Sequence, residues 1–326
     1  MQETPRFNYI ITIHNKEGLI NDVMQAVLAC CGPNSFVYPV LDGCTDGTEA
    51  IINGIIAKDK KGRITKVFVN DVHELLSINA GLRAASQEGE GFNIVLQDDV
   101  VLSDPTIEQK VKAVYAWGGP KLGYLSFRLG ANLKKNTLSS SELTPYMDCI
   151  ENVYGHGLPD AKPLLPGEFA YRDIPIKSPV CFPFYLVREV GMLEEKLAPY
   201  AHDDIDYGIR CIQAGYRNGV LGVPFRSDIK WGGTRQKMHP NMVKIISRNM
   251  DRVRSWHEKA IKALVAAPKE LTPIQVPGIE VTPKEQAEAE EIWKRNQAEL
   301  DTFAKQTTPR LLKIKQALTR RFLSRS

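Results

Sequence analysis

Hydrophobic and polar positions alternate between two periods along the first hundred residues. Short runs rich in β-branched and aromatic residues predict buried strands over residues 7–14, 35–41, 64–70 and 92–97. The stretches between these runs place apolar residues at helical spacing and predict helices over residues 18–31, 46–59 and 73–87. Four strands alternating with helices predict an α/β fold, a mostly parallel sheet with helices on both faces.

The rest of the chain is less uniform. Residues 123–180 are rich in Pro and Gly, without a clear period, and predict long loops of the kind that bind substrates. Helical spacing returns within residues 202–222 and again over residues 238–265. The pattern therefore predicts one large domain over residues 1–265, a Pro-rich linker over 266–283 and a helical tail over 284–326.

Composition narrows the class of protein. The chain has 326 residues, of which 43% are hydrophobic and 25% charged, as in ordinary globular proteins. A net charge of +4 is too small to indicate nucleic-acid binding. The six cysteines form no CxxC pair and no secretory signal is evident, so we expect free thiols in the cytoplasm. No apolar run is long enough to predict a membrane-spanning helix.

Polar residues follow three of the four predicted strands. His14 and Asn15 follow the first strand, Asp42 the second, and the pair Asp98 and Asp99 the fourth. In open α/β sheets, ligands bind beyond the carboxyl ends of the strands. These residues are therefore expected to meet at one edge of the sheet.

The segment LDGCTDGT, residues 41–48, has two readings. It is typical of a polar turn in which glycines adopt positive φ and an acid caps the next helix. It is equally typical of a nucleotide pocket, in which Asp42 accepts hydrogen bonds from a base or ribose and small neighbours allow close approach.

Two further clusters of acidic residues suggest metal binding and acid–base catalysis. Asp98 and Asp99 are either a solvated turn or, because they end an apolar strand, ligands for Mg²⁺ or Mn²⁺. In HDDIDYGIR, residues 202–210, acids suit the first turn of a helix. Three acids within four positions also raise the proton affinity of one of them, which suits a general base. Arg210 is placed to hold these acids or a phosphate.

Four strings in order resemble glycosyltransferase family 2, with its GT-A fold: IITIHNKEGLINDVMQAVL, LDGCTDGT, INAGLRAA…NIVLQDDVVLSDP and GMLEE…HDDIDYGIRCIQAGYR. The resemblance covers about residues 7–235. It implies an inverting enzyme that transfers a sugar from a nucleotide-diphosphate sugar to a hydroxyl of a glycan or lipid-linked acceptor, as in cell-envelope polysaccharide or glycan assembly.

The resemblance also implies roles for individual residues. Asp204 matches the catalytic base, with Asp203 in place of the Glu that usually precedes it. Asp99 matches a metal ligand of the DXD motif, whose first position is Gln97 here, and would hold Mg²⁺ or Mn²⁺. The residues implied to bind the nucleotide sugar are Thr12, His14, Asn15, Asp42, Asp98, Arg210 and Lys230.

The chain departs from the family in two ways. No His follows the acidic helix at the usual spacing, and Lys230 is the nearest candidate to bind the diphosphate and lessen the need for a metal. The QxxRW signature of processive synthases is absent, so a non-processive enzyme is expected.

Two other functions share these features. A sugar-1-phosphate nucleotidyltransferase also uses acids at strand ends, but it usually has a Gly-rich basic loop after the first strand, and HNKEGL resembles this loop poorly. A non-catalytic nucleotide-sugar-binding module would not need both Asp99 and Asp204. Release of nucleoside diphosphate, of pyrophosphate or of neither distinguishes the three.

The end of the chain raises a separate question. Residues 309–326 contain six Lys or Arg and no acid, with apolar residues at helical spacing. Such a helix either docks on the domain or on a second subunit of a homo-oligomer, or lies on anionic lipid at the inner face of the membrane.

Overall fold

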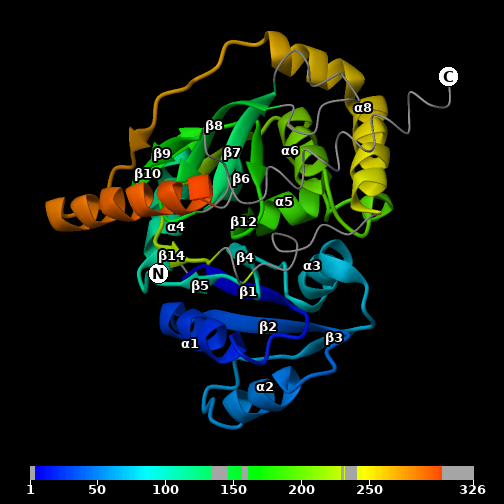
Figure 1. Ribbon diagram of the computed structural model, residues 1–326, viewed down its shortest axis with the longest axis vertical. Helices are drawn as coiled ribbons and strands as arrows, with labels where there is room; N and C mark the ends of the chain where they lie inside the picture. Colours follow the sequence, from blue (N-terminus) through cyan, green and yellow to red (C-terminus); the bar gives the residue numbers. More distant parts are fainter. Residues whose placement is uncertain (1–3, 134–145, 156–160, 229–230, 232–240, 303–326) are drawn as a thin grey trace.

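Strand β1 (Arg6–Ile13) lies inside the main sheet, third from one edge, and all but its first residue are buried. A strand buried on both faces is typical of parallel sheets covered by helices. The computed structural model describes residues 4–133, 146–155, 161–228, 231 and 241–302 (Figure 1).

The main sheet has nine strands in the order β15-β10-β13-β6-β12-β4-β1-β2-β3. All of them except β10 and β12 run in the same direction. Its remaining strands are β2 (Ser35–Asp42), β3 (Val67–Val69), β4 (Gly91–Gln97), β6 (Leu122–Ser126), β10 (Glu168–Tyr171), β12 (Val180–Pro183), β13 (Arg217–Leu221) and β15 (Ile274–Gln275). The predicted α/β fold with a mostly parallel sheet is therefore confirmed.

Helices cover both faces of this sheet. They are α1 (Ile20–Cys30), α2 (Thr48–Ile56), α3 (His73–Ala84), α4 (Ile107–Gly118), α5 (Phe184–Glu189), the 3₁₀ helix η2 (Glu195–Leu197), α6 (Asp203–Gln213) and α8 (Met242–Ala266). Side chains alternate along β1, so Tyr9 and Ile11 pack in one core with α1 and α4, while Ile10 packs in a second core with α3 and α6. This alternation fixes which helices lie over each face.

The region expected to be irregular contains short strands instead. Strands β7 (Leu129–Leu133), β8 (Tyr146–Asn152), β9 (Lys162–Leu164) and β11 (Ile174–Ile176) form a four-stranded sheet, and β5 (Val101–Leu102) pairs with β14 (Phe225–Arg226). Most of these strands are only two to five residues long and pair with distant segments. Such short strands show little periodicity of hydrophobic residues along the chain, which explains why the sequence did not predict these strands.

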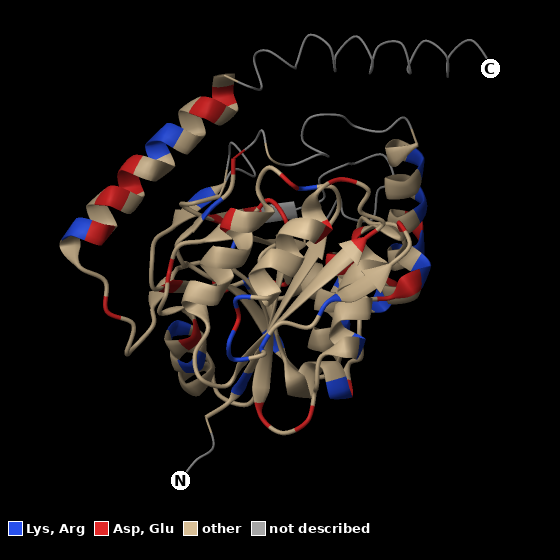
Figure 2. Ribbon diagram, turned by 90° about the horizontal axis from the view of Figure 1, so that it is seen from below, with Lys and Arg blue, Asp and Glu red and all other residues tan. Residues whose placement is uncertain are grey.

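The segment expected to be a linker adds to the fold. Strand β15 pairs with β10, and Val276 and Ile279 are buried. A helix over residues 283–302 follows, and Thr282 and Glu285 form reciprocal hydrogen bonds at its start. This helix carries both signs of charge (Figure 2) and docks through Asn296, whose amide donates to the Val153 and Gly155 carbonyls. The basic segment 309–326 lies outside the described residues.

Candidate active site

The carboxyl ends of β1, β2 and β4 lie side by side. β1 is the central strand of the three, and Thr12 aligns with Val40 of β2 and with Gln97 of β4. The residues after these strands therefore meet at one edge, as the sequence predicts. Thr12 is buried within the sheet, where its hydroxyl lies 3.4 Å from the Leu96 carbonyl oxygen.

His14 joins the ends of all three strands. Its backbone N–H donates to Asp98 Oδ2 at 2.8 Å, and its ring Nδ1 lies 2.6 Å from the Asp42 carbonyl oxygen. Asn15 has φ 49° and accepts a hydrogen bond of 2.7 Å from the Thr45 N–H. The imidazole is thus fixed at the rim of the site, and Asn15 shapes the loop beside it.

Asp42 is 4% exposed at the base of this rim. Its Oδ1 accepts a hydrogen bond of 2.7 Å from the Val72 N–H. Asp71 has φ 51° and places Oδ1 3.9 Å from His14 Nδ1. The Asp42 backbone carbonyl and the Asp71 carboxylate therefore lie near the imidazole ring, and these oxygens suit the N–H and O–H donors of a nucleoside.

A lysine that the sequence reading overlooked accompanies Asp98. The Lys16 ammonium lies 3.3 Å from Asp98 Oδ1 and donates to the Trp231 carbonyl at 2.9 Å. Burial raises the pKa of Asp98 to about 6, although Lys16 and the His14 N–H lower it in part. Lys16 brings positive charge to the strand edge, where a diphosphate would need it.

A buried ionic network connects this edge to helix α6. Gln97 Nε2 donates to Glu74 Oε1 at 2.7 Å, and Glu74 Oε2 lies 3.5 Å from the Lys177 ammonium. Lys177 also donates to Asp203 at the start of α6. Glu74 and Lys177 belong to no recognised motif, so only the fold brings them to the site.

Asp204 is half-buried in the first turn of α6, beside this network. The pKa of Asp204 is raised to about 7, first by burial and then by Asp203, while Lys177 opposes both effects. A carboxyl group with a pKa near neutrality can accept a proton from a hydroxyl at neutral pH and release it afterwards.

Arg210 belongs to the scaffold of α6. Its guanidinium donates to Asp206 Oδ2 at 2.8 Å and to the carbonyls of Val190 and Met192. His257 of α8 lies 2.8 Å from the other Asp206 oxygen. Arg210 therefore holds an acid, one of the two roles that the sequence suggests, and within the described part of the chain its hydrogen bonds do not reach the strand edge. Lys230 lies outside the described residues.

The site offers limited protein ligands for a metal. No three His, Cys, Asp or Glu side chains are grouped to hold an ion in the part of the chain that the structure describes. Asp99, which is 6% exposed, follows directly after Asp98. This donor set fits an ion that takes one protein carboxylate and further oxygens from a bound diphosphate, as Mg²⁺ often does.

Asn249 of α8 supports the chain that leads into α6. Its amide group is buried and donates to the carbonyls of Leu197, Tyr200 and Ala201. We expect Asn249→Ala to lower the free energy of unfolding by about 2–3 kcal/mol, because buried acceptors lose their partner. Urea unfolding measures this, with the exposed Ser247→Ala as a matched control on the same helix; equal midpoints would contradict the role of Asn249.

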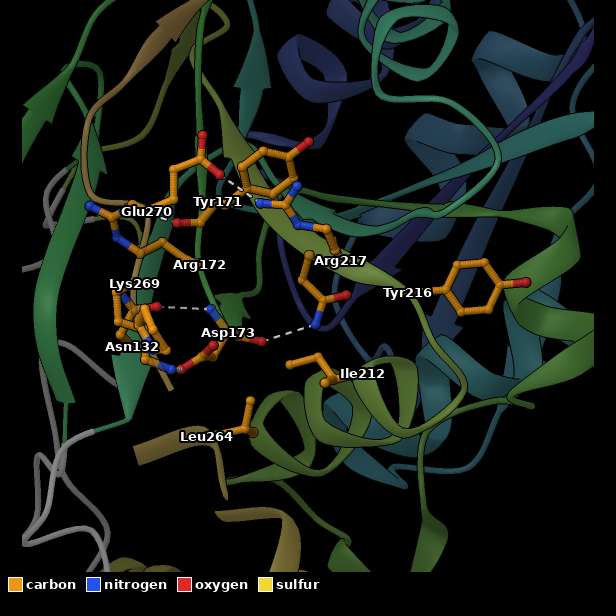
Figure 3. A pocket seen from close by; sticks show the side chains of 12 residues that line it. Asn132, Tyr171, Arg172, Asp173, Ile212, Tyr216, Arg217, Leu264, Lys269 and Glu270 are labelled. Atoms are coloured by element: carbon orange, nitrogen blue, oxygen red, sulfur yellow. Dashed lines mark hydrogen bonds and ion pairs between the residues drawn. The ribbon is translucent and has the colours of Figure 1, made fainter. Parts of the chain in front are cut away.

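A separate pocket lies at the other end of α6 (Figure 3). Ile212, Tyr216 and Leu264 contribute to its lining. Four of its charged side chains form pairs, Lys269 with Asp173 and Arg217 with Glu270. None of the described residues predicted from the sequence lines this pocket, so the candidate active site is the strand edge and not this pocket.

Comparison with known proteins gives distant matches. No protein-family model and no curated protein matches the chain. TarS of S. aureus matches with 15% identity and a TM-score of 0.49, over 68% of this chain and 36% of that one. The mannosyltransferase PcManGT of Pyrobaculum calidifontis, in complex with GDP-Man and Mn²⁺, matches with 16% identity and a TM-score of 0.47, over 93% of this chain and 87% of that one. S. aureus TarS 1–349 in complex with UDP matches with 14% identity and a TM-score of 0.47, over 89% and 80%.

This chain thus spans about a third of the length of the first TarS chain. At these identities and scores the matches assign no activity to this chain. None of the described helices is long and apolar enough to cross a membrane.

Proposed function

We propose that the protein is an inverting, non-processive glycosyltransferase that uses a nucleotide-diphosphate sugar. The observation that carries this proposal is the position of Asp204 in the first turn of α6, next to Asp203, which Lys177 and Glu74 connect to the strand edge of Asp98 and Asp99. Burial and Asp203 raise the pKa of Asp204 to about 7. The resemblance to glycosyltransferase family 2 over residues 7–235 supports it.

The residues of the site would have different roles in the reaction. Asp42 and His14 would bind the nucleoside, while Asp98, Lys16 and the loop of Asn15 would lie around the diphosphate. Asp204 takes the proton of an acceptor hydroxyl as its oxygen bonds to the anomeric carbon, and the bond from that carbon to the diphosphate oxygen breaks. Attack from the face opposite the leaving group inverts the anomeric centre.

A divalent cation fits this scheme at one place. Asp99 would hold Mg²⁺ or Mn²⁺ together with the donor diphosphate, and the ion would supply charge to stabilise the departing diphosphate. Lys16 already contributes one positive charge beside Asp98, so part of this stabilisation comes from the chain itself.

The acceptor is proposed on the resemblance alone. It would be a hydroxyl of a glycan or lipid-linked intermediate in cell-envelope polysaccharide or glycan assembly. Contact of the basic segment 309–326 with a membrane surface, or with a second copy of the chain, remains a prediction.

A donor screen tests the proposed function. The protein is incubated with a panel of nucleotide sugars, with and without Mn²⁺, and products are separated. Nucleoside diphosphate released in the presence of an acceptor supports a glycosyltransferase. Pyrophosphate formed from a nucleoside triphosphate and a sugar 1-phosphate would indicate a nucleotidyltransferase instead, and binding without either product would indicate a binding module.

The reaction should depend on pH through Asp204. The base works only when deprotonated, and burial raises its pKa to about 7. We therefore expect kcat at saturating donor to rise about tenfold between pH 6 and pH 8, with its midpoint near pH 7. A rate that is flat over this range, with chemistry shown to be rate-limiting, would contradict the assignment.

A further inference from the structure

The buried lysine Lys177 lies between the donor side of the site and the base. Its side chain is 9% exposed, and its ammonium bonds with Glu74 on one side and Asp203 on the other. Glu74 in turn accepts a hydrogen bond from Gln97, which directly precedes Asp98 and Asp99. The Lys177 ammonium thus connects Glu74 of α3 with Asp203 of α6.

The charges around Asp204 are unbalanced without this lysine. The groups that face Asp204 are Asp203 on its own helix, Glu74 on α3 and Lys177 before β12. The Tyr124 hydroxyl of β6 also interacts with Asp204, and burial keeps it neutral by raising the pKa of Tyr124. Lys177 is therefore the cation that opposes the negative charge of three carboxyl groups.

We propose that Lys177 is a positioning residue for the transfer reaction, holding Asp203 so that Asp204 faces the acceptor and keeping Asp204 able to accept a proton at neutral pH. This inference rests on the proposed function, which it deepens. Burial alone would lower the pKa of Lys177, but Asp203 and Glu74 raise it, so the lysine stays charged.

The proposal predicts a change in pH dependence that a purely structural lysine would not give. In Lys177→Met, the buried Asp203 and the half-buried Glu74 and Asp204 repel one another without a cation, so Asp204 holds its proton to higher pH. We expect the rising limb of kcat to move up by at least one pH unit, with a loss of about fivefold or more at pH 7 that is largely recovered near pH 9. KM for the donor should change much less than kcat.

Two matched variants keep the test decisive if Lys177→Met is unstable. Lys177→Arg keeps the charge and should retain the wild-type midpoint. Glu74→Gln removes one negative charge and should move the midpoint downward, opposite to Lys177→Met. An unchanged midpoint in both Lys177→Met and Glu74→Gln, or the same upward shift in Lys177→Arg as in Lys177→Met, would overturn the proposal.

A second readout does not depend on activity. The titration of the Asp204 carboxyl carbon is followed by NMR in ¹³C-aspartate-labelled protein, and Asp204→Asn identifies the resonance by its loss. An upward shift of at least one pH unit in Lys177→Met supports the proposal, and an identical titration contradicts it. If the wild type transfers no sugar from any donor, the proposed function fails, and the NMR midpoints still decide whether Lys177 controls Asp204.

Discussion

Replacement of Asp204 by Asn is expected to abolish transfer. The amide cannot accept the hydroxyl proton, and loss of a general base typically costs about 10²–10⁴-fold in rate. Asn has nearly the same shape, and Asp204 accepts a hydrogen bond only from the adjacent Ile205 N–H among the bonds described, so the helix should form as before. We therefore expect kcat to fall by this factor while donor affinity stays within about threefold.

Steady-state release of nucleoside diphosphate gives kcat, and calorimetric titration of the donor gives its affinity. Asp251→Asn is the matched control, because it makes the same chemical change at an exposed position of α8. Turnover of Asp204→Asn at more than a tenth of the wild-type rate would show that another group takes the proton.

Replacement of Asp99 by Asn should act on the donor side instead. The amide is a poorer ligand for a hard cation than the carboxylate, so the charge that stabilises the leaving diphosphate is weakened. We expect kcat/KM to fall by about 10²–10³-fold, the usual loss when one stabilising group for transition-state charge is removed.

The measurement is a titration of activity with Mn²⁺ for wild type and variant. Asp22→Asn, at an exposed position of α1, serves as the control for the chemical change. If wild type and Asp99→Asn respond to Mn²⁺ with the same midpoint and the same maximal rate, Asp99 does not hold the ion.

The first half of the fold could be predicted because its signals are local. The strands β1, β2 and β4 are seven or eight residues long and mostly buried, and in α1 and α3 the apolar spacing extends over three turns. The small sheet of β7, β8, β9 and β11 could not be predicted. Its strands are short, they pair with other segments of the chain, and they show no regular alternation of hydrophobic and polar residues.

The same distinction applies to the site. Asp42, Asp98 and His14 could be placed because each follows a recognisable strand. Lys177 and Glu74 could not, since their role depends on contacts between residues about a hundred positions apart. Arg210 had a usable signal in its spacing of four from Asp206, which favours an ion pair along the helix over a contact with phosphate.

One sugar nucleotide is expected to span the strand edge and reach Asp204. A crystal structure with a bound, non-hydrolysable nucleotide sugar tests it most directly. We predict the nucleoside beside Asp42 and His14, the diphosphate beside Asp99 and Lys16, and the anomeric carbon facing Asp204. A nucleotide bound in the pocket of Figure 3, or one that leaves Asp204 beyond reach of an acceptor at the anomeric carbon, would contradict the account.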